Sequence, residues 1–161
     1  MKTGAISKEK AILKIRQFCA YQERCDSEVR EKLNSMDITG IQADKIVADL
    51  VRGSYLNDER FATHFAGSKF RLKKWGRIKI RYALQVKKIH AEMIKNAVDK
   101  IDESEYLKTL SRLSDQKIVS LKSEKNSTQK KRKLKDYLLQ KGYEHRLIEM
   151  QFSKIKMFPG R

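Results

Sequence analysis

The sequence has little of what builds loops, disulfide frameworks or membrane spans. Its 161 residues include one proline, seven glycines and two cysteines. So little proline and glycine excludes a collagen-like or loop-rich chain. Cys19 and Cys25 lack the second cysteine pair that would complete a zinc site. No run approaches the roughly 18 apolar residues of a membrane span, and the first residues lack the apolar core of a signal peptide. We therefore expect a cytoplasmic protein with reduced thiols and no metal or other cofactor.

Acidic residues are missing from one long stretch of the chain. Residues 60–91 hold ten Lys or Arg residues and no Asp or Glu. Residues 1–59 carry equal numbers of both signs, whereas residues 117–161 are again basic, so the net charge of +17 lies in two blocks. Because a block of one sign costs self-repulsion, it usually faces an anionic partner.

Catalytic signatures are also missing. The chain has no glycine-rich phosphate loop, no HExxH and no GxSxG pattern. Asp58 and Glu59 follow Asn57 at a predicted helix start, where the helix dipole explains two carboxylates better than metal-dependent nuclease chemistry does. We therefore predict a binding protein, not an enzyme.

What the chain does have is helical periodicity along most of its length. Apolar residues recur at helical spacing in nine segments, separated by short polar stretches. Ser7 and Asn57 are predicted N-caps, and Thr39 with Gln42 forms a predicted capping box. The segment 120–127 is polar, and we expect either a loop or a frayed helix end there.

A local pattern indicates an internal repeat. An apolar residue, a basic residue and a leucine three positions further on recur at 29–33, 80–84 and 134–138. A unit of about 50 residues is marginally stable by itself, and stacking against neighbours extends its core. We therefore predict an all-α fold of three tandem three-helix repeats in an elongated, curved array. The predicted repeats are 1–54, 55–101 and 102–156, followed by a C-terminal tail at 157–161.

The candidate binding residues are cations of the two basic blocks. On a helical wheel, Arg77, Arg81 and Lys88 fall within roughly 40° of one another. They lack acidic neighbours in the sequence, so we expect them to point outward. The alternative is a solvated basic face that only aids solubility. The predicted partner-binding residues are Lys69, Arg71, Lys73, Lys74, Arg77, Arg81, Lys87, Lys88, Lys130, Lys131 and Arg132.

Two features have a structural and a functional interpretation. Lys130, Lys131 and Arg132 belong to a basic start of a predicted helix, which is either a mobile charged linker or a second anion-contacting arm. Trp75 lies at a predicted helix junction, where it either fills a packing gap or anchors a partner.

One segment resembles the signature of a known family. Residues 53–62 read Gly-Ser-Tyr-Leu-Asn-Asp-Glu-Arg-Phe-Ala, and the basic run 69–71, Gly76, the pair Ile80 and Leu84, and the run 88–89 follow in order. This arrangement resembles the RecX family of bacterial recombinase regulators. The resemblance implies three tandem three-helix repeats and a monomeric, non-catalytic protein that binds the RecA filament on DNA and modulates, usually inhibits, recombination and ATP hydrolysis.

Two other hypotheses explain the same basic block. The chain could be a nucleic-acid-binding module that contacts single- or double-stranded DNA phosphates without RecA. It could also be a structural adaptor for an acidic protein partner.

Overall fold

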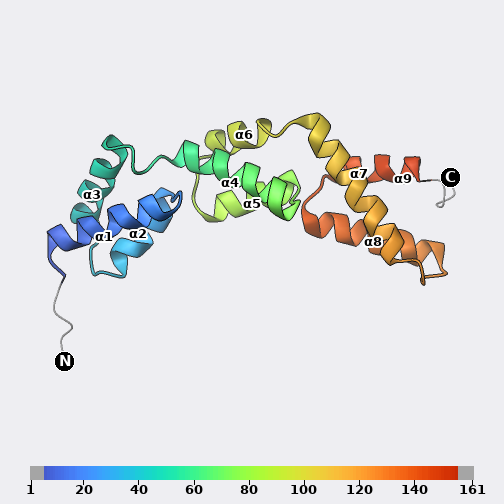
Figure 1. Cartoon of the computed structure of the whole chain (residues 1–161), viewed down its shortest axis with the longest axis horizontal. Coiled ribbons are helices and arrows are strands. Elements are labelled where there is room, and N and C mark those ends of the chain that lie inside the picture. The colour runs from blue at the N-terminus through green and yellow to red at the C-terminus, as the bar shows by residue number, and fades with distance from the viewer. Residues whose placement is uncertain (1–5, 156–161) are drawn as a thin grey trace, which may run out of the picture.

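The structure, a computed structural model, describes residues 6–155. The predicted tail at 157–161 lies outside these residues. Within residues 6–155 the chain forms nine helices and no strand, arranged as an elongated row of three helix clusters (Figure 1). The all-α prediction with tandem three-helix repeats is therefore confirmed. The helices are α1 (Lys8–Tyr21), α2 (Asp26–Asn34), α3 (Gly40–Arg52), α4 (Asp58–Lys73), α5 (Arg77–Val86), α6 (Ala91–Asp99), α7 (Glu103–Ser120), α8 (Ser127–Lys141) and α9 (His145–Lys154).

Short polar side chains begin most of these helices, as the sequence predicts. Ser7 and Asn57 accept hydrogen bonds from the amides of Lys10 and Arg60, at 3.3 and 2.9 Å, so both predicted N-caps are confirmed. The predicted capping box at Thr39 is wrong, because its side chain makes no cap hydrogen bond. The polar segment 121–126 separates α7 from α8.

The helices pack in consecutive triplets, which we call the first, middle and last units. They comprise α1–α3, α4–α6 and α7–α9. The predicted repeat boundaries fall in the links between α3 and α4 and between α6 and α7. The exact division stays a prediction, because the middle and last units share one core.

The core of the first unit is separate, whereas the middle and last units share a continuous one. Ile15, Val29 and Leu50 belong to the first core. The second core runs from Phe61 on α4 to Phe152 on α9. The array is therefore divided into a small hydrophobic body and a larger one.

Hydrogen bonds between polar groups cross the joint between the first and middle units. The amide of Asp26 donates to the carboxylate of Asp58 at 2.8 Å, and the hydroxyl of Ser27 donates to the carbonyl of Lys87 at 2.6 Å. Burial is the first cause that raises the pKa of Asp58, and nearby Asp26 and Glu28 add to it. Hydrogen bonds of this kind add little net stability each, so the joint depends on several of them acting together.

Cys25 is the apolar part of this joint. Although it precedes α2 in the first unit, it is fully buried within the core of the middle and last units. Burial raises the pKa of the Cys25 thiol. The thiol is therefore protonated and shielded from solvent at neutral pH.

We expect Cys25 to react with iodoacetamide at least about 100-fold more slowly in the native protein than in urea, because reaction requires the joint to open. Mass spectrometry of the alkylated peptides measures the rate. Val119→Cys is the control, because Val119 is 72 % exposed on α7 and a thiol there should react freely. Equal rates at Cys25 and this introduced cysteine would show that the joint is open.

The joint between the middle and last units is tight and involves backbone atoms. The amide of Gly76 donates to the carbonyl of Lys141 at 2.7 Å, and the amide of Ile78 donates to the carbonyl of Gly142 at 2.9 Å. A Cβ atom on Gly76 would lie 2.3 Å from the carbonyl of Gly142. The start of α5 therefore packs directly on the end of α8, and glycine is required at position 76.

Candidate interaction surface

The basic residues of the middle unit do not form one continuous face. Lys69 on α4 lines a groove beside the first unit, together with Lys79 and Lys87 of the α5 region. Arg71 lines a different depression, which faces α6 and the start of α7. Residues two positions apart on a helix point in nearly opposite directions, so the acid-free block is divided between two sides of the unit.

Arg77 is not an outward-facing cation, so the sequence prediction of its orientation is wrong. Its side chain is only 14 % exposed and forms ion pairs with Glu103 and Glu144 of the last unit. Its guanidinium also stacks 3.8 Å from the ring centre of Tyr106. Both glutamates come from beyond residue 100, so a search for acidic neighbours in the sequence cannot find them. Arg77 joins two units.

Tyr106 completes this ion-pair cluster. Its hydroxyl donates to Glu144 and accepts from the amide of Arg77 at 3.0 Å. Burial first, and then the hydrogen bond to Glu144, raise the pKa of Tyr106 well above its usual range. The phenol therefore remains a donor at all physiological pH values, and the cluster is a structural element of the second joint.

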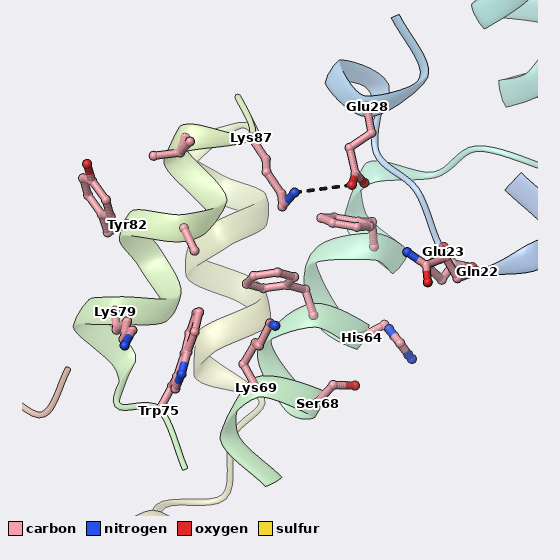
Figure 2. A pocket seen from close by; sticks show the side chains of 14 residues that line it. Gln22, Glu23, Glu28, His64, Ser68, Lys69, Trp75, Lys79, Tyr82 and Lys87 are labelled. Atoms are coloured by element: carbon pink, nitrogen blue, oxygen red, sulfur yellow. Dashed lines mark hydrogen bonds and ion pairs between the residues drawn. The ribbon is translucent and has the colours of Figure 1, made fainter. Parts of the chain in front are cut away.

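Lys87 is also engaged within the molecule. Its amine lies 3.3 Å from the Glu28 carboxylate, across the joint between the first and middle units (Figure 2). The expectation of a free cation is therefore wrong here as well. Arg81 is half-buried beside Arg77 in a depression that also contains Asp99. The pKa of Asp99 is lowered first by a hydrogen bond from Lys95, and the charges of Lys95 and Arg81 add to this.

Four other predicted residues lie at the surface with no carboxylate within ion-pair distance among residues 6–155. Arg71, Lys73 and Lys88 are exposed, and Lys74 is half-buried at the end of α4. The amine of Lys74 donates to the carbonyl of Arg71 at 2.7 Å, which leaves its charge unneutralised. These cations are available to an anionic partner without breaking an internal ion pair.

Trp75 lines the groove and is only partly buried, so it both packs and remains accessible. Its ring lies edge-on to that of Phe65, with a centre-to-centre distance of 6.3 Å. The amines of Lys69 and Lys79 lie 5.0 and 4.6 Å from its ring centre. Figure 2 shows Trp75 beside Lys69, with Lys79 and Tyr82 on the neighbouring helix. The predicted site omitted Lys79 and Tyr82, because only the fold brings α4 and α5 together around Trp75.

The second basic block lies far from the first. Lys130, Lys131 and Arg132 occupy the first turns of α8, and the other end of this helix contacts α5. At a rise of about 1.5 Å per residue, Lys130 lies about 16 Å along the helix axis from Lys141, so the two blocks lie at opposite ends of α8. The amine of Lys131 lies 5.1 Å from the ring centre of Phe152, and Arg132 approaches Asp136 at 3.9 Å. The segment is helical from Ser127 onward, which contradicts the charged-linker interpretation.

These features define the class of the protein. It is a helical-repeat protein with unneutralised cations and an aromatic groove on its middle unit. No helix between residues 6 and 155 has the length and apolar character to cross a bilayer. The family model described as "RecX, second three-helix domain" matches residues 57–98, which is the middle unit.

Known proteins extend this match to most of the chain. "Regulatory protein RecX" of Clostridium botulinum strain Eklund 17B is 30% identical over 127 residues, which cover 78% of this chain and 59% of the relative. The protein of the same name from Bacillus cytotoxicus is 23% identical over 148 residues, covering 92% and 54%. The chain thus spans little more than half the length of these two curated relatives.

The fold agrees with a solved structure. The crystal structure of RecX from Lactobacillus salivarius superposes with a TM-score of 0.82 at 21% identity, covering 92% of this chain and 96% of that one. The family model and the curated relatives support the RecX family for this chain. Its relatives are named regulatory proteins, not enzymes.

Proposed function

We propose that this chain regulates a RecA recombinase by binding the RecA filament on DNA as a monomer in the cytoplasm, and that it lowers strand exchange and ATP hydrolysis. The observation that supports this most directly is the set of surface cations on the middle unit without carboxylate partners among the described residues. Arg71, Lys73 and Lys88 are exposed, so they can meet an anionic surface at no cost in internal ion pairs. The second support is that the similar proteins are named regulatory protein RecX.

The shape of the molecule suits a filament. The three units form an elongated row (Figure 1), so one molecule can contact more than one protomer of a helical assembly. Contacts repeated along a filament add through effective concentration. Individually weak electrostatic contacts therefore suffice for firm binding.

Strand exchange and ATPase assays with RecA from the same organism test the proposal. We expect both rates to fall as the protein is added. A triple charge reversal, Arg71→Glu, Lys73→Glu and Lys88→Glu, should weaken filament binding at least about tenfold, because it replaces attraction with repulsion at three positions. Co-sedimentation with RecA filaments measures the affinity. The control Lys45→Glu also reverses an exposed charge, but on α3 of the first unit, and should leave the affinity unchanged.

The same proteins distinguish direct DNA binding from filament binding. If the chain binds DNA by itself, a plot of log affinity for DNA against log salt concentration should have a slope of about −0.7 to −0.9 for each phosphate neutralised. Filament binding that persists at a salt concentration where naked DNA is released supports the proposal. Unchanged strand exchange and ATPase at saturating protein would contradict it.

A further inference from the structure

We propose that the groove between the first and middle units binds a short segment of a partner protein in which a large apolar side chain is flanked by acidic residues. This deepens the proposed function, because it names the kind of partner segment that a filament would supply. The groove has a volume of about 710 Å³, within the range of about 300–1,000 Å³ typical of ligand sites in proteins.

The floor of the groove is aromatic and apolar. Phe61 and Phe65 of α4 stack with a centroid distance of 5.7 Å, and Trp75 meets Phe65 edge-on. Ala83 and Val86 of α5 complete the apolar surface. An apolar side chain that enters here buries its own surface and that of partly exposed rings, which is the pattern of an interface hot spot.

The helix beside the groove presents an unpaired apolar stripe. Ile78, Tyr82 and Val86 follow one another at i, i+4 and i+8, and their exposed fractions are 49, 67 and 63 %. A stripe at this spacing normally faces a core or a partner. Tyr82 and Val86 also line the groove, so the stripe and the groove form one continuous apolar surface.

Charge selects the flanking residues of the occupant. The amines of Lys69 and Lys79 lie over the Trp75 ring and have no carboxylate within ion-pair distance among residues 6–155. An acidic side chain next to the apolar anchor would therefore form ion pairs with both amines. The site is partly dehydrated, and charge pairs there are stronger than in bulk water.

The opposite wall of the groove disfavours nucleic acid. Glu23 and Glu28 of the first unit line it, and they are paired with Arg60 at 2.7 Å and with Lys87 at 3.3 Å. The groove thus contains Lys69, Lys79 and Lys87 against two glutamates, a net charge of only +1. A phosphate backbone needs a run of unneutralised cations, whereas an acidic side chain of a peptide needs only Lys69 and Lys79. The observations therefore favour a protein segment over single-stranded DNA.

Trp75 provides a direct measurement, because it is the single tryptophan of the chain. The probe is the tryptophan-free peptide Asp-Asp-Leu-Phe-Glu-Glu, with Lys-Lys-Leu-Phe-Lys-Lys and oligothymidylate as comparison ligands. We expect only the acidic peptide to give a saturable change in Trp75 fluorescence. Val86→Glu should weaken its binding at least about tenfold by adding a charge to the apolar surface. The control Val119→Glu changes another exposed valine, on α7, and should have no effect.

The other outcomes overturn the inference. No response to the acidic peptide, equal binding of the lysine peptide, or tighter binding of oligothymidylate would each show that the groove does not select such a segment.

Co-sedimentation with RecA filaments tests the groove assignment separately from the proposed function. If the unchanged protein and Val86→Glu bind filaments equally, the groove has no role and filament regulation stands. If the unchanged protein binds the acidic peptide but no filament, the proposed function fails and the groove assignment stands.

Discussion

Replacing Arg77 by glutamate should destabilise the protein by about 3 kcal/mol, although a basic helix face would lead one to expect a harmless surface change. The substitution removes a largely buried guanidinium from between Glu103 and Glu144 and adds a third carboxylate beside them. It also removes the cation that stacks on Tyr106. Three carboxylates around one phenol repel one another, and Arg81 is the arginine that remains in this depression. The joint between the middle and last units should open first.

Urea denaturation followed by circular dichroism measures this loss. The matched control is Arg71→Glu, which makes the same charge reversal at an exposed position of the same unit. Surface changes of this kind usually stay within about 0.5 kcal/mol. If both variants unfold at the same urea concentration, the ion-pair cluster contributes nothing measurable, and the second joint must depend on its apolar contacts.

Gly76→Ala should cost about 2–4 kcal/mol, since the added methyl group has no space. Its Cβ atom would lie 2.3 Å from the carbonyl of Gly142 and 2.5 Å from the amide of Tyr143. These are backbone atoms of the last unit, so they cannot rotate away as a side chain can. The hydrogen bond from Gly76 to Lys141 would have to lengthen. We expect a lower thermal midpoint and loss of the α5–α8 contact.

Gly67→Ala is the control for this variant. Gly67 lies inside α4, and a Cβ atom there meets only the flexible end of the Arg71 side chain. Alanine in a helix interior is favoured over glycine by roughly 0.5–1 kcal/mol, so this variant should be neutral or more stable. Calorimetry on the two alanine variants therefore separates steric exclusion from helix propensity. Equal midpoints would contradict the close approach of α5 and α8.

Much of the fold could be predicted because its signals are local. The N-caps Ser7 and Asn57 depend on residues within one turn of a helix start. The repeated pattern at 80–84 likewise contains Ile80 and Leu84, which are fully buried. Helical periodicity and capping chemistry act over a few residues, and the printed sequence contains them completely.

The site was harder to predict, because its charges are paired across units. Arg77 and Lys87 have no acid nearby in the sequence, yet Glu144 and Glu28 neutralise them from 67 and 59 residues away. The acid-free stretch lies in the middle unit, but the sequence could not show which of its cations are paired with distant carboxylates. The groove around Trp75 was missed for the same reason, because its walls come from two units.

The buried position of Cys25 also has a consequence for folding during translation. The ribosome delivers the first unit before the middle one, and the thiol that precedes α2 belongs to the core that forms later. A nascent chain stalled before α4 has therefore completed its first bundle while leaving this sulfur uncovered. Emergence of the next three helices closes over it, so thiol accessibility on translating ribosomes marks the moment at which the two bodies meet.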